Sequence, residues 1–134
     1  MIIHQFDQTN SILNSFIAEI RDVNIQKDAM RFRRNIERIG EVLAYEMSKT
    51  LDYEPKEVTT PLGIKKSFLC SDKLVLCSVL RAGLPLHHGI LSYFDGAENA
   101  FISAYRNHPN NDDAFEVIVN YFAAPPLDDK ILVL

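Results

Sequence analysis

The chain has 134 residues, 47% of them hydrophobic and 24% charged, and its 14 basic and 18 acidic side chains give a net charge of −4. These values are typical of one soluble globular domain. The acidic excess argues against a protein that binds nucleic acid through a broadly basic surface. No stretch reaches the roughly 18 apolar residues that a membrane span needs, and the first residues do not resemble a signal peptide. We therefore expect a cytoplasmic protein without a membrane or nucleic-acid partner.

Two helices are predicted near the start of the chain. Side-chain oxygens at residues 9–11 can cap a short amphipathic helix that ends near Arg21. Its expected apolar stripe consists of Ile12, Phe16, Ile17 and Ile20. A break at residues 22–24 precedes a longer helix with apolar residues at helical spacing. The residues expected to face inward from this longer helix are Met30, Phe32, Ile36, Ile39, Val42, Leu43 and Met47.

The other face of the longer helix is charged. It carries Arg31, Arg33, Arg34, Glu37, Arg38 and Glu41. Residues three or four positions apart are neighbours on a helix, so these opposite charges can pair with each other. We interpret this face as a solvated, self-paired surface rather than a nucleic-acid-binding helix.

A β-hairpin is predicted next. Two extended runs within residues 55–72 flank a turn signal at residues 60–63, which read TPLG. Lys65 and Lys66 are expected to be exposed on this hairpin.

The residues after the hairpin predict a βαβ unit. Residues 74–80 are nearly all apolar, as in a parallel strand that is buried on both faces. A helix is predicted over residues 84–93, and residues 100–105 form a second apolar strand. Such a crossover is right-handed and its two strands are parallel.

The rest of the chain predicts two more strands. A polar loop at residues 106–113 leads to an alternating, half-buried strand at residues 115–121 near a sheet edge. Residues 130–134 are expected to form a buried strand that is cut off, because a buried parallel strand should lead into a covering helix. We therefore expect one incomplete α/β domain, with a helical part at residues 1–53 and a hairpin and sheet part at residues 54–134.

The candidate functional residues follow the strands. Ligands of open α/β sheets bind outside the carboxyl ends of the strands. Arg81 comes directly after the first strand, and Arg106 comes directly after the second. Ala82 and Gly83 are small enough for backbone amides to approach an anion at the start of a helix. Because a guanidinium group suits phosphate oxygens, these residues predict a site that binds a polyanion.

A purely structural role for Arg81 is equally compatible with the spacing alone. An arginine at the start of a helix can pair with a carboxylate such as Asp95 or Glu98.

Other reactive side chains do not form a recognisable site. His87 and His88 are adjacent, so on a helix they point about 100° apart and cannot share a metal ion. Cys70 and Cys77 have no metal-ligand spacing, and we expect both to be reduced. From these spacings the sequence predicts no metal site. The order of Ser, His, Asp and Cys residues indicates no nucleophile, so no catalytic residue is assigned.

Several motifs together resemble the uracil phosphoribosyltransferase family. Residues 79–84 read VLRAGL, Gly89 follows, and residues 104–107 read AYRN. The family carries an LRAGL loop and a YRN or YRD segment in the same order and at this distance. Further similar residues, including the TPLG turn, extend the resemblance over residues 21–134.

The resemblance implies a type I phosphoribosyltransferase fold, which is a Rossmann-like parallel sheet with N-terminal helices and a β-hairpin arm. It implies the conversion of uracil and 5-phosphoribosyl 1-pyrophosphate to UMP and pyrophosphate in pyrimidine salvage, with Mg²⁺ held largely through the substrate. By this resemblance Arg81, Ala82, Gly83 and Arg106 bind the diphosphate. It also implies a homodimer or a larger homo-oligomer. We further predict a cis peptide bond in the loop, because such loops in phosphoribosyltransferases often hold one.

The sequence departs from the family in two places. Residues 85–89 read PLHHG where the family reads Gly-Met-x-Asp-Gly. The family's ribose 5-phosphate segment, Asp-Pro-Met-Leu-Ala-Thr-Gly, and its uracil-binding segment would come after Leu134. We therefore expect these 134 residues to hold the diphosphate-binding side and to be inactive alone. The alternative is a non-catalytic regulatory relative that binds an anion or a nucleotide.

Overall fold

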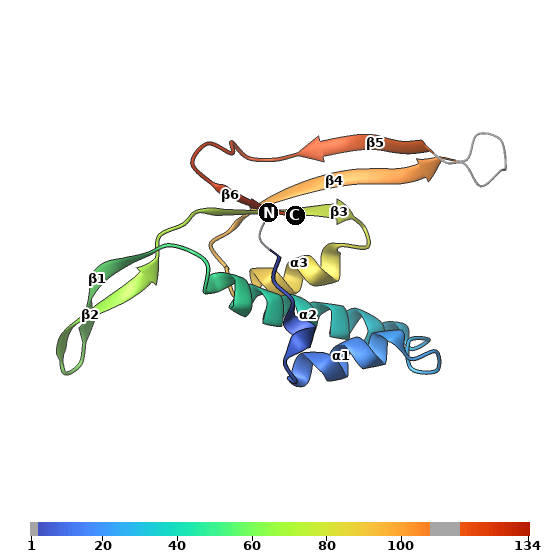
Figure 1. Ribbon diagram of the computed structural model, residues 1–134. Coiled ribbons are helices and arrows are strands. Elements are labelled where there is room, and N and C mark those ends of the chain that lie inside the picture. The colour runs from blue at the N-terminus through green and yellow to red at the C-terminus, as the bar shows by residue number, and fades with distance from the viewer. Residues whose placement is uncertain (1–2, 108–115) are drawn as a thin grey trace.

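The structure, a computed structural model, describes residues 3–107 and 116–134. In this part of the chain the helices lie on one side of a four-stranded sheet, and a separate two-stranded hairpin projects from the other elements (Figure 1). The helix α3 contacts the sheet, α2 packs on α3, and α1 packs on α2. The α/β class predicted from the sequence is confirmed.

The helix α1 (Ile12–Arg21) follows a short 3₁₀ turn at Phe6–Gln8 and begins at the predicted cap. The Ser11 hydroxyl accepts a hydrogen bond from the Leu13 N–H at 3.3 Å. The predicted apolar stripe is wrong at one position, because Ile12 is 64% exposed and Leu13 is 3% exposed. Phe16, Ile17 and Ile20 follow Leu13 by three, four and seven residues, so these four side chains share the face of α1 that packs on α2.

The helix α2 (Ala29–Ser48) begins later than the predicted break. Asp28 caps it by accepting hydrogen bonds from the N–H groups of Met30 and Arg31, at 3.1 and 3.0 Å. Met30 was expected to face inward, and so was Phe32, but the two side chains are 66% and 38% exposed. Met30 lies in the first turn of α2 and lines an open groove with Pro85 and His88 of α3, so its side chain is only partly covered by the described residues.

The buried residues of α2 are Asn35, Gly40 and Ala44. A Cβ atom on Gly40 would lie 2.5 Å from the Leu86 carbonyl oxygen of α3 (Leu84–Leu91). A Cβ atom on Gly89 would lie 2.0 Å from the Glu37 carbonyl oxygen. The two helices therefore meet backbone against backbone, and large side chains are excluded from their crossing point.

The charged face of α2 is self-paired at Arg34, as predicted, whereas Arg31 pairs with Glu19 of α1 and with Asp28 before α2. The Arg34 guanidinium lies 2.7 Å from the Glu37 carboxylate and 3.7 Å from that of Glu41. These ion pairs are partly exposed and each contributes little to stability. They leave this face as an ordinary solvated surface.

The four-stranded sheet has the order β5-β4-β3-β6. The strands β3 (Leu74–Leu80) and β4 (Glu98–Asn107) are parallel and flank α3, which confirms the βαβ unit. The strand β6 (Ile131–Val133) is also parallel to β3, whereas β5 (Glu116–Ala123) is antiparallel to β4 at the predicted edge. The antiparallel direction of β5 has a simple reason. A parallel pair requires a crossover of about a dozen residues, and residues 108–115 are too few for it. Most of the expected polar loop falls in residues 108–115, outside the described residues.

Burial in the sheet is concentrated in β3. Its first five residues are buried, and Val75 and Cys77 form a core cluster with Ala100 of β4. The last run of the chain was expected to be a buried strand, but Leu132 of β6 is 48% exposed. The reason is that β6 is an edge strand of this sheet, paired only with β3 in the part of the chain that the structure describes.

The predicted hairpin is confirmed as β1 (Tyr53–Thr60) and β2 (Gly63–Cys70). The turn between them needs a glycine, because Gly63 has a φ of 131°. Lys65 and Lys66 are exposed, as expected. No helix among the described residues is long and apolar enough to cross a membrane.

Candidate anion-binding site

The loop between β3 and α3 is a tight turn. Its Leu80–Arg81 peptide bond is cis, as predicted. The Gly83 N–H donates to the Val79 carbonyl at 3.1 Å, and the Leu84 N–H donates to the Arg81 carbonyl at 3.3 Å. A Cβ atom on Gly83 would lie 3.0 Å from the Val79 carbonyl oxygen, so the fold has little room for a side chain there.

Two groups of this loop, the Arg81 side chain and the Ala82 N–H, have no partner among the described residues. The Arg81 side chain is exposed, and it forms no ion pair or hydrogen bond with any residue that the structure describes. The Ala82 N–H likewise donates to no described group. Both groups lie just before α3, and the amino-terminal end of a helix carries a partial positive charge. The loop can therefore donate hydrogen bonds to an anion without first breaking bonds within the described chain.

The competing structural role for Arg81 is absent from the described residues. Glu98 forms an ion pair with Lys130 instead. Asp95 and Glu98 also lie before β4 and at its first residue, at the sheet end opposite Arg81. The arginine is thus not held by either of the carboxylates that the spacing offered.

Arg106 lies within β4 and not in the loop that was expected to carry it. Leu80, the last residue of β3, is level with Ser103, and β4 continues past this point because Arg106 is paired with Val117 of β5. Arg106 is exposed, about 10 Å beyond Ser103 at the usual rise of a strand. The structure therefore places Arg81 and Arg106 at the same end of the sheet, with Arg106 on a two-stranded extension.

One polar contact beside the loop was not predicted from the sequence. His87 of α3 is buried and bonds to side chains of both β3 and β4. The one feature of the sequence that could have predicted this contact is a histidine on the sheet-facing side of a helix, opposite a serine of a strand. Among the described residues, no cluster of three or more His, Cys, Asp or Glu side chains could hold a metal ion.

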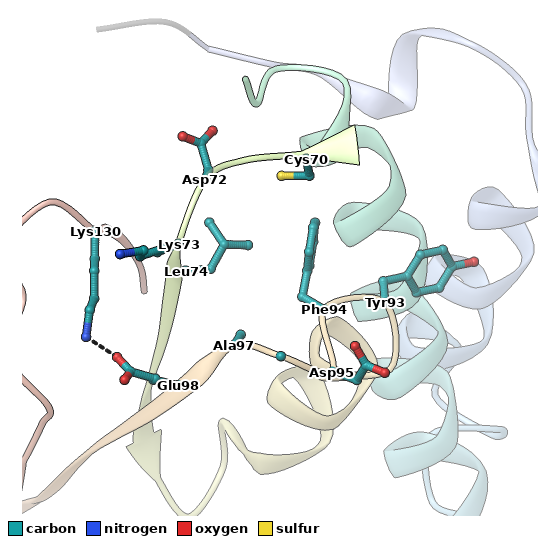
Figure 2. A pocket seen from close by; sticks show the side chains of 11 residues that line it. Cys70, Asp72, Lys73, Leu74, Tyr93, Phe94, Asp95, Ala97, Glu98 and Lys130 are labelled. Carbon is teal, nitrogen blue, oxygen red and sulfur yellow. Dashed lines mark hydrogen bonds and ion pairs between the residues drawn. The ribbon is translucent and has the colours of Figure 1, made fainter. Parts of the chain in front are cut away.

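A cavity lies elsewhere, at the amino ends of β3 and β4 (Figure 2). It has a volume of about 380 Å³ and is lined by Cys70, Asp72, Lys73, Leu74, Tyr93, Phe94, Asp95, Gly96, Ala97, Glu98 and Lys130. Because ligands of open α/β sheets bind at the carboxyl ends of the strands, we place the candidate site at the loop and not in this cavity.

Comparisons with known proteins give a consistent result. The family model described as uracil phosphoribosyltransferase matches residues 8–134. The chain is 52% identical over 125 residues to a uracil phosphoribosyltransferase of Porphyromonas gingivalis, with 93% of the chain and 57% of the relative covered. It is 39% identical over 127 residues to that of Methanothermobacter thermautotrophicus, with the same two coverages.

A solved structure gives the same picture of the fold. A protein from Aquifex aeolicus superposes with a TM-score of 0.78 at 27% sequence identity, covering 98% of this chain and 60% of that protein. The chain thus spans less than two thirds of the length of each of these relatives.

Proposed function

The chain belongs to the uracil phosphoribosyltransferase family, and from this premise we propose that its Arg81 loop binds the diphosphate of 5-phosphoribosyl 1-pyrophosphate. The reaction is the transfer of the phosphoribosyl group to uracil. The observation that carries the proposal is that, among the residues which the structure describes, neither the Arg81 side chain nor the Ala82 N–H at the start of α3 has a partner. The names of the relatives favour this reaction over a non-catalytic regulatory role.

The loop acts on the leaving group. In the transfer, the bond between ribose C1 and the pyrophosphate oxygen breaks and its electron pair leaves with the pyrophosphate. Uracil N1 bonds to ribose C1 and releases its proton to water. Negative charge therefore grows on the diphosphate oxygens. The Arg81 guanidinium and the Ala82 N–H donate hydrogen bonds to these oxygens, whereas the Gly83 N–H stays bonded to the Val79 carbonyl. Arg106 adds a second positive charge at this end of the sheet.

Magnesium fits this scheme as an ion bound through the substrate. Mg²⁺ prefers oxygen ligands, and the diphosphate supplies them. The diphosphate is therefore proposed as the main source of the ligands of the ion. When bound, the ion neutralises part of the diphosphate charge.

The 134 residues alone are proposed to bind 5-phosphoribosyl 1-pyrophosphate without forming UMP, because they span only 57% of the Porphyromonas gingivalis relative. Isothermal titration calorimetry with the Mg²⁺ complex of this substrate tests the binding, and conversion of labelled uracil to UMP tests the turnover. The full-length relative serves as the positive control in both assays. Absence of binding to the chain contradicts the diphosphate proposal, and UMP formation contradicts the proposal that the chain is inactive alone.

A homo-oligomer, assembled through the hairpin, is also proposed. Cross-strand partners share one face, so Tyr53, Phe68 and Ile64 lie together on one side of β1 and β2. These side chains are 44%, 65% and 70% exposed. Glu57 and Lys66 lie opposite each other on the same side, between Phe68 and Ile64. Because an isolated hairpin is marginally stable in water, the three exposed apolar side chains of this face fit contact with a second copy of the chain.

A further inference from the structure

Three polar side chains link α3 to both central strands of the sheet. The His87 Nδ1 atom lies 2.9 Å from the Ser78 hydroxyl oxygen of β3. The His87 Nε2 atom lies 2.7 Å from the Asn99 Oδ1 atom of β4. His87 is only 4% exposed and Ser78 only 8%. The Phe101 ring lies beside the imidazole, with 5.3 Å between the ring centroids.

The partners of the imidazole select one neutral form. A neutral histidine has one donor nitrogen and one acceptor nitrogen. The Asn99 Oδ1 atom only accepts, so Nε2 carries the hydrogen and donates it. Nδ1 is then the acceptor and receives the hydrogen bond of the Ser78 hydroxyl. Every polar atom of the ring is satisfied in this one tautomer.

Two of these residues, Ser78 and His87, lie at the base of the anion-binding loop, and Asn99 lies farther from it, level with Leu76 of β3. Ser78 lies on β3, three residues before Arg81. The His87 N–H donates to the Gly83 carbonyl at 3.0 Å. A Cβ atom on Gly83 would lie 3.4 Å from the Ser78 Cβ atom, so the last loop residue packs directly on the serine. The imidazole therefore joins the strand before the loop to the helix after it, and both of these to β4.

We propose that His87, held as the Nε2–H tautomer by Ser78 and Asn99, is a positioning residue that fixes the Arg81 loop for diphosphate binding. The proposal rests on the proposed function of that loop. The reason for this role is geometric. The Ala82 N–H can donate a hydrogen bond to the anion only if α3 is held at a fixed angle to β3. The three side chains touch no substrate themselves, and they act through the loop backbone.

The experiment compares variants that change one hydrogen bond at nearly constant volume. Ser78→Ala removes the donor to Nδ1, and Asn99→Leu removes the acceptor from Nε2. Asn99→Asp keeps an acceptor oxygen at the same place and is the rescue variant. His88→Gln is the control, because His88 is the exposed neighbour on the same helix. Binding of 5-phosphoribosyl 1-pyrophosphate with Mg²⁺ is measured by calorimetry, well below the unfolding temperature of each variant.

The expected result is a rise in Kd of about three- to tenfold for Ser78→Ala and for Asn99→Leu, the size of one neutral hydrogen bond. Asn99→Asp and His88→Gln are expected to stay within about twofold of the wild type, less than the loss of that one bond. A role in packing alone lowers the unfolding temperature of the first two variants and leaves Kd unchanged at the assay temperature. Unchanged Kd in folded Ser78→Ala and Asn99→Leu overturns the proposal.

A second readout keeps this proposal separate from the function of the loop. In ¹⁵N-labelled wild-type chain, the His87 ring is expected to show Nε2 protonated and Nδ1 unprotonated. The backbone amide signals of Ala82 and Gly83 are expected to move in Ser78→Ala and in Asn99→Leu but not in His88→Gln. If the wild type binds no 5-phosphoribosyl 1-pyrophosphate, the proposed function fails, and these amide signals alone decide whether His87 positions the loop. Loop signals that stay in place in both variants overturn the positioning role.

Discussion

Arg81 is the side chain on which the candidate site depends most. It is exposed and free of any partner among the described residues, so its removal costs no interaction within that part of the fold. Arg81→Ala is expected to raise the Kd for 5-phosphoribosyl 1-pyrophosphate about 10- to 100-fold, because charged hydrogen bonds to the diphosphate are lost. Calorimetry measures this change, and thermal unfolding is expected to stay the same.

The matched control for this prediction is Lys65→Ala, which removes the same charge from the exposed hairpin. Equal losses of affinity in both variants would assign the effect of Arg81 to net charge and would contradict a local contact.

Glu19 gives a pH-dependent contact between α1 and α2. The Asn35 amide donates to the Glu19 carboxylate at 2.6 Å, and this hydrogen bond, with help from Arg31, lowers the pKa of Glu19 below its ordinary value. The ionised carboxylate is the form that is stabilised on folding. Its contribution is therefore complete above the pKa of the unfolded chain and is lost as the pH falls through the lowered pKa of the folded state.

Urea unfolding of the wild type and of Glu19→Gln at several pH values measures this contribution. The free energies of unfolding are expected to differ at neutral pH and to converge at acidic pH, below the folded pKa of Glu19. A difference that is the same at neutral and at acidic pH would show that the charged form of Glu19 is not what stabilises the contact.

At the scale of elements, the crossing of α2 and α3 determines where the loop sits. Gly89→Ala places a Cβ atom 2.0 Å from the Glu37 carbonyl oxygen if nothing moves. Because the obstacle is backbone, the helices must separate, and we expect a loss of about 1–3 kcal/mol in the free energy of unfolding. Gly96→Ala is the control, since a Cβ atom there would meet nothing within 4 Å. Equal stability of the two variants in urea would contradict the close approach.

Elements with a local signal could be predicted from the sequence. The Ser11 cap, the turn at Gly63 and the nearly continuous apolar run of β3 each depend on neighbouring residues, and all three are present. The resemblance to a family located the loop and its cis peptide bond.

Features that depend on tertiary contacts could not be predicted in the same way. The spacing did not show that Leu13 rather than Ile12 faces α2, because both lie near one stripe. Nor did it show that β4 continues through Arg106, since that extension depends on pairing with β5. The contacts of His87 with two different strands are likewise set by how α3 lies on the sheet.

At the scale of the whole molecule, the two strands of the hairpin pack mainly on each other, and the hairpin projects from the other elements (Figure 1). If its apolar face contacts a second copy, Phe68→Lys is expected to shift sedimentation velocity toward a smaller species at the same protein concentration. Lys65→Glu is the control on the opposite face of the hairpin. An unchanged distribution in Phe68→Lys would contradict assembly through this face.

The central claim is that the anion site lies at the Arg81 loop and not in the cavity of Figure 2. Titration of the ¹⁵N-labelled chain with pyrophosphate and Mg²⁺, followed through the backbone amide signals, tests this claim most directly. We predict saturable shifts that are largest at Arg81, Ala82, Gly83 and the first turn of α3. Shifts concentrated at Lys73 and Lys130 of the cavity, or no saturable shift at all, would contradict it.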